Sequence, residues 1–382
     1  MQPLPRLSLR HLVLGAVCCA VPTSLPPAQA PPAQEVGPAV SRVAFGSCFR
    51  TERDASVWDS IAAVSPEVLI LAGDNVYADT ADPARLRAAW AKLDAIEGFA
   101  ELRRSSELLA TWDDHDYGVN DGGAEFPARE VSQQVFLDFL GEPADSSLRG
   151  RAGVYRSWCT GPAERHLQVI LLDTRYHRGP LERLTDEERS ALRGMGRYRP
   201  ATEATSTMLG DEQWAWLEAR LREPARLRIV VSSIQVVPEE QRFESWSNLP
   251  HERRRLVELV ARTGAEGVVF LSGDRHMAEL SRLEPEVARE TLGVELAYPL
   301  LDFTSSSLNS SMRGHREEPN RHRIAGPYFD DNFGVVEVDW EAADPRVTLA
   351  LHAARGGVVL RHELRLSEIS GPGRGSATGR SE

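Results

Sequence analysis

The sequence predicts an α/β protein built from layered sheets, and three features of the chain support this. Short apolar segments alternate with helical segments as far as Gly273. The apolar segments show no polar alternation, which is typical of strands buried on both faces. After Gly273 the pattern turns to strands. Strands and helices in alternation indicate a layered sheet, and we expect the later strands to complete a second sheet of the same domain.

The elements follow one another in a regular order. In the first part, strands are expected at residues 42–45, 67–72 and 108–112, with helices after them at 54–64, 83–104 and 127–140. A strand at 167–173 is followed by two helix–strand pairs, at 211–222 and 228–233 and at 251–262 and 267–273. The later strands are expected at 278–283, 299–304, 334–340, 346–353 and 357–366. Residues 177–208 are Arg-rich and weakly patterned, so we expect a lid or a surface excursion there.

The two ends of the chain differ from this domain. Residues 1–30 combine Arg6 and Arg10 with an apolar run that ends at Pro22, and a small-residue site follows at positions 28–30. This pattern is typical of a cleaved signal peptide, so we expect a secreted or periplasmic protein. The apolar run is too short to span a bilayer. We expect a linker at residues 31–40 and a disordered tail at residues 366–382.

The charge of the chain excludes some partners. The net charge is −12, and removal of residues 1–30 changes it to −14 because two arginines and no acids are lost. Such a protein is a poor non-specific binder of nucleic acid or anionic membranes. We therefore expect no nucleic-acid partner. We also expect a monomer with no stable membrane span. Cys48 and Cys159 remain after cleavage, and they could form a disulfide or one could be a metal ligand.

One acidic segment lacks any cation nearby in the chain. Four aspartates and His115 lie within residues 113–121, and no Lys or Arg occurs between residues 104 and 129. Like charges repel one another, and a buried carboxylate without a partner is costly. Either water solvates these side chains or a cation from outside the chain belongs there.

Reactive side chains of several kinds follow four of the predicted strands. They are Cys48, then Asp74 and Tyr77, then Asp114 and His115, and finally Asp274 and His276. Each alone has an ordinary explanation as a helix cap, a turn residue or a packed side chain. The carboxyl ends of strands in an open α/β sheet meet at one edge, however. Thiolate, phenolate, imidazole and carboxylates together form a ligand set for iron, zinc, manganese or calcium.

This ligand set favours hydrolysis of a phosphate ester. Asp74 can bridge two ions, and a paired site can hold a hydroxide that attacks phosphorus. The transition state needs charge neutralisation more than covalent help. His115 is expected to protonate the leaving alkoxide, the alternative being a simple hydrogen bond to a neighbouring carboxylate. Only one of Asp113 and Asp114 is expected to point into the site, because neighbours on a strand point in opposite directions.

Two other classes of function fit the sequence less well. The segment "SSSLNSS" is not a Gly-x-Ser-x-Gly elbow, so a serine hydrolase is disfavoured. A non-enzymatic calcium-binding surface protein would need the acids, but not Cys48, Tyr77 and His115. We therefore expect an exported metal-dependent phosphoric monoester or diester hydrolase that acts on a small-molecule phosphate ester. A phosphodiesterase or phospholipase D-like activity at the same site remains the alternative.

The ordered motifs resemble those of a known family. "FGSC", "GDNVY", "WDDHD", "LLDTRYHR", "SGDRH" and "DFTSSS" are similar in kind and order to motifs of the PhoD-like alkaline phosphatases, a branch of the calcineurin-like metallophosphoesterases. The resemblance covers Val43 to about Trp340. It implies a four-layer α/β/β/α metallophosphoesterase sandwich with mixed sheets, which makes residues 41–365 the catalytic domain. Members of this family often carry an additional immunoglobulin-like domain, which we do not expect here.

The resemblance also implies roles for particular residues. Cys48 and Tyr77 match the family's ligands to Fe³⁺, and Ca²⁺ is the other metal implied for a dinuclear or multinuclear site, with Zn²⁺ or Mn²⁺ as further options. His115 takes the place of the catalytic histidine. Asp74, Asp114, Asp274 and His276 complete the implied metal ligands. Asn75, Asn120 and Arg175 are candidates for substrate binding, the alternative being that they are ordinary turn or surface residues.

Overall fold

The structure is a computed structural model that describes residues 37–192, 195–312 and 318–371. The chain divides into two units, Met1–Glu35 and Val36–Glu382, and the description below concerns the second. The predicted signal peptide and most of the predicted linker lie outside the described residues.

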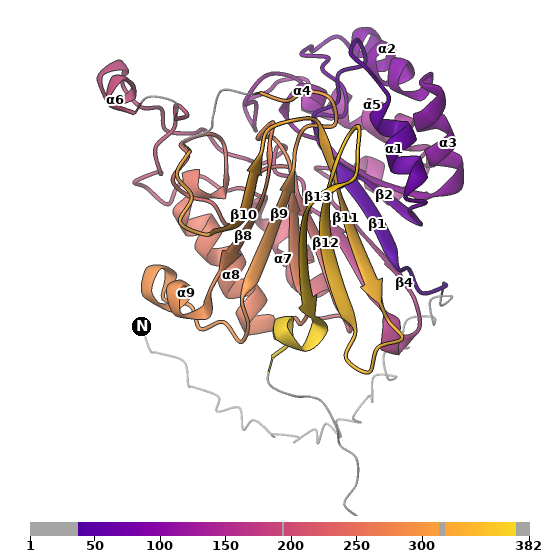
Figure 1. The fold of residues 1–382 in the computed structure, drawn as a ribbon. Coiled ribbons are helices and arrows are strands. Elements are labelled where there is room, and N and C mark those ends of the chain that lie inside the picture. Colours follow the sequence, from indigo (N-terminus) through magenta and orange to yellow (C-terminus); the bar gives the residue numbers. More distant parts are fainter. Residues whose placement is uncertain (1–36, 193–194, 313–317, 372–382) are drawn as a thin grey trace, which may run out of the picture. The chain divides into compact units, whose positions relative to one another are not determined.

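Strands supply most of the frame that positions the site (Figure 1). The strands are β1 (Arg42–Gly46), β2 (Val68–Ala72), β3 (Glu107–Thr111), β4 (Arg156–Thr160), β5 (Leu167–Leu171), β6 (Leu227–Ser232), β7 (Val268–Ser272), β8 (Ala278–Leu283), β9 (Leu300–Ser305), β10 (Arg323–Tyr328), β11 (Asn332–Asp339), β12 (Arg346–Ala353) and β13 (Val358–Arg365). The α-helices are α1 (Val57–Ala63), α2 (Pro83–Asp94), α3 (Glu97–Ser105), α4 (Asp114–Tyr117), α5 (Arg129–Leu140), α6 (Asp186–Ala191), α7 (Gly210–Leu221), α8 (Pro250–Thr263) and α9 (Pro285–Leu292).

The strands form two mixed sheets. The first has the order β13-β12-β11-β1-β2-β3, and the second has the order β10-β8-β9-β7-β6-β5-β4. The expectation that the strands after Gly273 complete a second sheet is therefore confirmed for β8 and β9 and wrong for β11, β12 and β13. β8, β9 and β10 join the sheet of β4–β7, whereas β11 returns to pair antiparallel with β1, with Val336 opposite Val43. This pairing joins segments far apart in the chain, which local sequence patterns do not specify.

Four layers result, because helices cover the outer face of each sheet (Figure 1). In β1, Phe45 belongs to the core that includes the second sheet, whereas Ala44 belongs to the core that includes α1, α2, α3 and α5. The rings of Phe45 and Phe303 have centroids 5.1 Å apart, which joins β1 to β9 across the two sheets. Helices α7 and α8 contribute side chains to the core of the second sheet. The predicted α/β/β/α sandwich is confirmed.

Some boundaries differ from the sequence prediction. The expected helix 83–104 is two helices, because Ile96 has an extended backbone and breaks the run between α2 and α3. β4, β10, α4, α6 and α9 were not predicted. The expected tail at 366–382 begins too early, since Leu366–Ile369 form a 3₁₀ helix whose Leu366 and Ile369 are buried. Their apolar side chains extend the core and hold this segment in place.

Two further observations concern the cysteines and the helices. Cys48 and Cys159 are both free thiols, so they do not form a disulfide. Within the described ranges, no helix combines the length and apolar character needed to cross a membrane.

Candidate active site

The turns that follow β1, β2, β3 and β7 meet at one edge of the sandwich, close to α4. The Cys48 Sγ lies 3.6 Å from Asp74 Oδ2, which joins the first two turns. The backbone N–H of His115 donates to Asp74 Oδ1 at 3.2 Å, which joins the third. The backbone N–H of His276 donates to Ser306 Oγ at 2.7 Å, and that hydroxyl lies 3.4 Å from Cys48 Sγ. The predicted residues from all four turns are therefore neighbours.

Sharp turns bring these side chains to the sheet edge. Cys48, Asp74, Asp274 and His276 all have left-handed backbones, with φ of 60°, 51°, 68° and 53°. Few residues other than glycine adopt this conformation, although Asp and His do so more often than most. Such strain costs of the order of 1–3 kcal/mol at each position and tends to cluster at functional sites. Four of the six predicted metal ligands occupy this region, so the turns hold their side chains at some cost in stability.

Among the described residues, the site offers four sets of potential ligand atoms, in each of which the atoms lie within 4.8 Å of one another. The sets are Cys48, Asp74 and His276; Asp74, Asp114 and His115; Asp113, Asp114 and Asp274; and Asp114, Asp121 and Glu244. Asp74 belongs to two of these sets and Asp114 to three. Shared carboxylates are what adjacent cations require as bridges. The donor set, which combines a thiol, an imidazole and several carboxylates, therefore fits more than one bound cation.

The imidazole of His276 presents one nitrogen to the site. Its Nδ1 contacts the carbonyl oxygen of Ser310, which can only accept a hydrogen bond, so Nδ1 carries the proton. Its Nε2 lies 3.3 Å from the hydroxyl of Tyr77. Burial lowers the pKa of His276 to about 4, which keeps the ring neutral. A neutral imidazole with a fixed tautomer is the form that binds metals.

The imidazole of His115 is held differently. Its Nδ1 lies 2.6 Å from Oδ1 of Asp79, and its ring lies against that of Tyr77 with centroids 4.3 Å apart. Burial opposes protonation of this ring, but the hydrogen bond to Asp79 and the charge of Asp114 outweigh it and raise the pKa of His115. The ring is therefore suited to carry and give up a proton. Asp79 was not among the predicted site residues, although it lies only two residues after "GDNVY".

Asp113 and Asp114 both take part in the site, contrary to the alternation argument. Asp113 is the N-cap of α4, so the chain leaves the extended conformation between the two residues. Asp114 accepts from its neighbour's N–H, that of His115, at 2.9 Å and from that of Asp121 at 2.6 Å. Both carboxylates, together with Asp274, lie in one set of potential ligands. Alternation holds only while the strand continues, and β3 ends at Thr111.

The carboxylates repel one another in the absence of a cation. Burial, and then the charge of Asp114, raise the pKa of Asp74 well above its usual range. Burial and the charge of Asp113 do the same to the pKa of Asp274. Burial also raises the pKa of the Cys48 thiol to about 12. Bound cations would reverse these shifts, because they favour the ionised form of each ligand.

The three predicted substrate-binding residues lie in different surroundings. Asn75 is buried, and its amide nitrogen donates to Asp116 Oδ2 at 2.6 Å and to the Thr111 carbonyl at 2.9 Å. Arg175 is fully buried, and its guanidinium contacts Asp113 and Glu244. Neither of these two residues lines the cavity of the site, whereas Asn120 is exposed and lines it. The surroundings of Asn75 and Arg175 are those of structural residues.

Sequence reasoning missed several residues of the site. Glu244 comes from the loop after β6, and Asp121 from the loop after α4. Tyr198 donates a hydrogen bond to Asp121 Oδ2 at 2.5 Å, which brings the 177–208 segment to the site. Ser306 lies in the "DFTSSS" motif, so the sequence contained a motif from which it could have been predicted. Glu244 and Tyr198 lie in weakly patterned segments, where no local signal was available.

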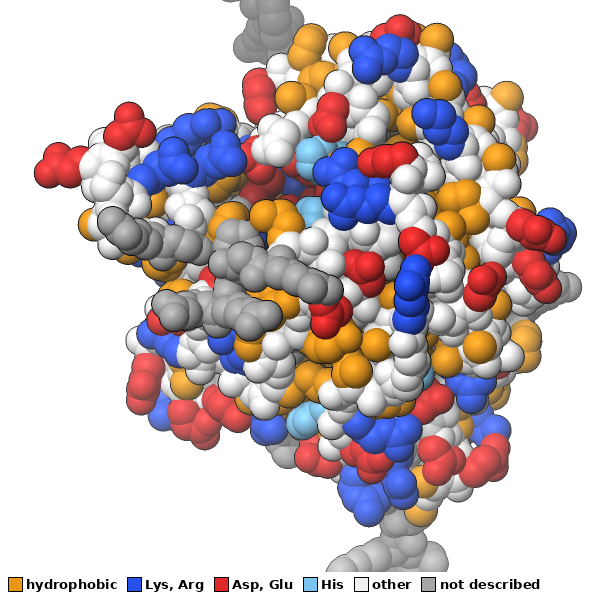
Figure 2. Space-filling model, turned by 45° about the horizontal axis from the view of Figure 1, so that its top comes forward, with side chains coloured by type: hydrophobic (Ala, Val, Ile, Leu, Met, Phe, Trp, Pro, Cys, Tyr) orange, Lys and Arg blue, Asp and Glu red, His pale blue; other side chains and the backbone are white. Residues whose placement is uncertain are grey.

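A cavity of about 190 Å³ opens above these side chains. Cys48 and Tyr77 do not line it, whereas the other four predicted metal ligands do. The lining consists of Asp74, Asp114, His115, Asn120, Asp121, Arg197, Tyr198, Phe243, Glu244, Asp274, Arg275, His276 and Met312. Figure 2 shows acidic and histidine side chains at the bottom of a hollow, with Lys and Arg side chains on both sides of it. The arrangement can hold an anionic group against bound cations, with a proton donor alongside.

Comparisons with known proteins agree with this geometry. The family model described as PhoD-like phosphatase matches residues 84–349, more than half of the 382 residues. The chain therefore belongs to the PhoD-like phosphatase family and is a phosphoesterase. The matched range includes Asp114, His115, Asp274 and His276 but begins after Cys48, Asp74 and Tyr77. The structure places these three earlier residues beside the later ones.

Solved structures agree on the fold. Seventeen solved chains match this one. A structure described as that of PhoD is similar with a TM-score of 0.65 and 17% sequence identity, over 87% of this chain and 70% of the other. At this identity the similarity establishes the fold alone. No curated protein matches the chain.

Proposed function

We propose that the protein is an exported, metal-dependent phosphoric ester hydrolase that uses His115 as its proton donor. The observation that carries this proposal is the gathering of Cys48, Asp74, Asp114 and His276 in overlapping sets of potential ligands at one sheet edge. Arg175 pairs with Asp113 and Glu244 rather than with Asp74 or Asp114, which favours positive ions as the missing partners of the latter two carboxylates. Export rests on the composition of residues 1–30.

The metal ligands in this proposal are Cys48, Asp74, Tyr77, Asp114, Asp274 and His276. When bound, the ions would polarise the phosphoryl group and neutralise its charge. The thiol and phenol support Fe³⁺ at the Cys48 side of the site. The carboxylates around Asp114 support Ca²⁺, with Zn²⁺ or Mn²⁺ as alternatives.

The chain's own residues supply the proton. Asp79 accepts from Nδ1–H of His115, which fixes the tautomer and the direction of the ring and leaves Nε2 as the atom that can give a proton to a leaving oxygen. The stacking of Tyr77 on the same ring limits its rotation. A leaving alkoxide needs a proton as its bond to phosphorus breaks, and a positioned acid typically accelerates such a step by about 10²–10⁴-fold.

The decisive test compares two variants for metal content and turnover of a chromogenic phosphate ester. His115→Ala is expected to keep its metals and lose about 10²–10⁴-fold in kcat. Asp74→Asn is expected to lose both metal and turnover, because it removes a shared ligand. Full activity in His115→Ala would remove the proton-donor role, and full metal content in Asp74→Asn would remove the bridging role.

Two additional measurements address the metals and the ester class. A ferric–phenolate site absorbs visible light, so Tyr77→Phe should lose colour if Tyr77 is a ligand. Colourless, iron-free protein would contradict the Fe³⁺ assignment. Metal-stripped enzyme should be inactive, and adding back single metals with a monoester and a diester would define which ions and which ester class support turnover.

A further inference from the structure

The cavity above the carboxylates has a basic wall that the proposed chemistry does not use. Arg197 and Arg275 both line it. Arg275 is buried and engaged, because its guanidinium contacts Glu318 at 2.5 Å and lies over the ring of Phe243 at 3.9 Å. The Arg197 side chain is exposed, and no described carboxylate or carbonyl lies within bonding distance of its guanidinium. In a chain of net charge −12, a cation at the site without a partner is a candidate for ligand binding.

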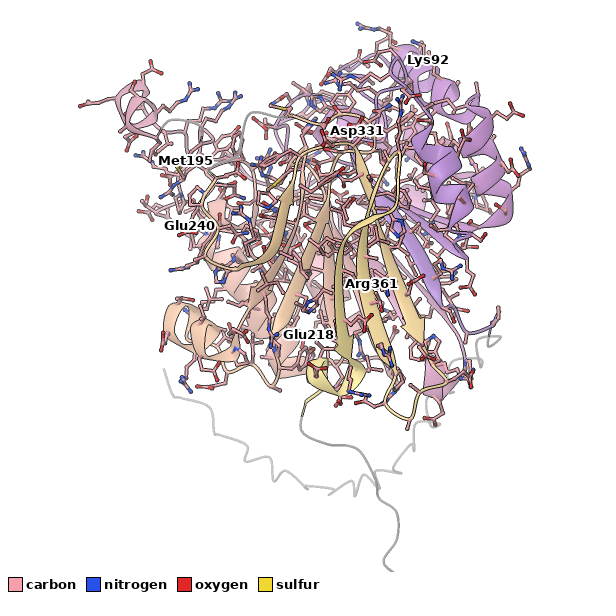
Figure 3. All side chains as sticks on the ribbon, viewed as in Figure 1. Lys92, Met195, Glu218, Glu240, Asp331 and Arg361 are labelled. Atoms are coloured by element: carbon pink, nitrogen blue, oxygen red, sulfur yellow. The ribbon has the colours of Figure 1, made fainter. Side chains whose placement is uncertain are left out.

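The backbone around Arg197 is fixed even though its side chain is free. The N–H of Gly196 donates to the Gln241 carbonyl, and that of Tyr198 donates to the Arg242 carbonyl, each at 2.9 Å. A Cβ at residue 196 would lie 2.0 Å from the Arg242 carbonyl oxygen, so the two segments touch closely. Figure 3 shows Met195, two residues before Arg197, near Glu240. Anchoring on both sides of Arg197 lowers the backbone entropy that this segment loses on binding a ligand, so mainly the side chain remains to be ordered.

The side chain of Tyr198 provides a second anchor. It is buried, and its hydroxyl donates to Asp121, a member of the ligand set with Asp114 and Glu244. This bond links the position of the Arg197 backbone to the same loop that forms the floor of the site. The basic wall and the acidic floor are therefore parts of one connected structure.

The size of the cavity places most of a substrate at the rim. Its volume of about 190 Å³ lies below the roughly 300–1,000 Å³ that is usual for sites that enclose a small molecule. A phosphoryl group held against the carboxylate-bound cations would fill much of it. The remainder of the molecule must then pass the rim, where Arg197 lies.

We propose that Arg197 binds a second anionic group of the substrate, a carboxylate or a second phosphoryl group carried a few bonds from the phosphorus that is attacked. This inference rests on the proposed function, and it narrows the substrate class to phosphate esters with two anionic groups. A guanidinium pairs well with either group, because its planar donors match two oxygens at once.

The test uses the metal-loaded enzyme and a chromogenic phosphate ester, with two phosphonates as competitive inhibitors. Phosphonoacetate carries a carboxylate that methylphosphonate lacks, and methylenediphosphonate carries a second phosphoryl group in its place. In the wild type, at least one of the two dianionic probes should bind more tightly than methylphosphonate. Arg197→Gln should reduce that preference by about three- to fivefold, as expected for a partly exposed charge pair. Arg197→Lys should keep part of it, and added salt should weaken it.

Arg189→Gln is the matched control. Arg189 lies in α6 of the same Arg-rich segment and is exposed, and it does not line the cavity. The Arg189→Gln variant should have the same inhibition constants as the wild type for all three phosphonates. The inference is overturned if Arg197→Gln keeps the wild-type preference, or if the wild type prefers neither dianionic probe. Failure of the wild type to hydrolyse any phosphate ester would instead remove the proposed function, and this inference with it.

Discussion

Replacing Arg175 with Met tests whether this residue is a structural cation or a substrate ligand. Its Nε donates to Asp113 at 2.7 Å, and its Nη1 donates to Glu244 at 2.6 Å. All three side chains are at most 1% exposed. Methionine is unbranched, apolar and shorter, so the variant removes the charge and the hydrogen bonds while filling much of the volume.

The structure sets the size of the expected effect. Removing one partner of a buried ion pair costs about 3–5 kcal/mol, because the remaining charges are left without compensation. Arg178 still reaches Glu244 at 3.0 Å, which limits the loss at that carboxylate, whereas Asp113 keeps only hydrogen-bond donors such as Ser233. We therefore expect a loss of about 3 kcal/mol or more, which corresponds to a fall in Tm of roughly 4–7 °C for a domain of this size.

The loss should depend on pH with a definite sign. Burial already raises the pKa of Asp113 to about 6 and that of Glu244 to about 7, even with Arg175 present. Without Arg175 both pKa values should rise further, because the guanidinium lowers them. A carboxyl group whose folded pKa lies above its unfolded value stabilises the fold at low pH, and this contribution is lost as the pH rises through the folded pKa. The variant should therefore be least impaired near pH 4–5 and most impaired above pH 7.

Thermal and urea unfolding at pH 5 and pH 8 would measure this effect. Arg199→Met is the matched control, since Arg199 pairs with Glu182 and Glu188 while it is itself 43% exposed. Arg199→Met should lower the free energy of unfolding by no more than about 1 kcal/mol. If Arg175→Met unfolds like the wild type at both pH values and instead raises KM, Arg175 binds substrate and the structural assignment is wrong.

Two more perturbations test other parts of the argument. Gly196→Ala should displace the segment around Tyr198, because a Cβ at residue 196 would lie 2.0 Å from the Arg242 carbonyl oxygen. Limited proteolysis should then cleave residues 177–208 faster than in the wild type. An unchanged cleavage rate would contradict the close packing. Burial opposes ionisation of Glu239, but His322, Arg253 and Arg321 outweigh it and lower its pKa to about 2. Glu239→Gln should therefore lower the free energy of unfolding by about 1–2 kcal/mol above about pH 5. This difference from the wild type should vanish as the pH falls toward 2. A difference in unfolding free energy that does not depend on pH would show that the charge of Glu239 is not responsible.

The sequence alone determined the strands, their buried character and the side chains that follow them. β1, β2, β3, β5, β6 and β7 were predicted within one or two residues, because a strand buried on both faces has an uninterrupted apolar signature. Parallel strands place their carboxyl ends at a common edge, so the neighbourhood of Cys48, Asp74, Asp114 and His276 could also be predicted. The metal-binding and catalytic roles of these residues stay predictions.

Only the tertiary structure decided which strands pair, and which loops reach the site. The return of β11 to β1 joins residues far apart in the chain, and either sheet offered an edge to the later strands. Glu244 and Tyr198 come from segments without periodicity, whose positions depend on what they pack against. Arg175 has no local partner in the sequence, and it is buried because Asp113 and Glu244 approach it from other turns. The local sequence pattern indicates whether a segment is buried. Which other segments it packs against depends on the contacts of the whole fold.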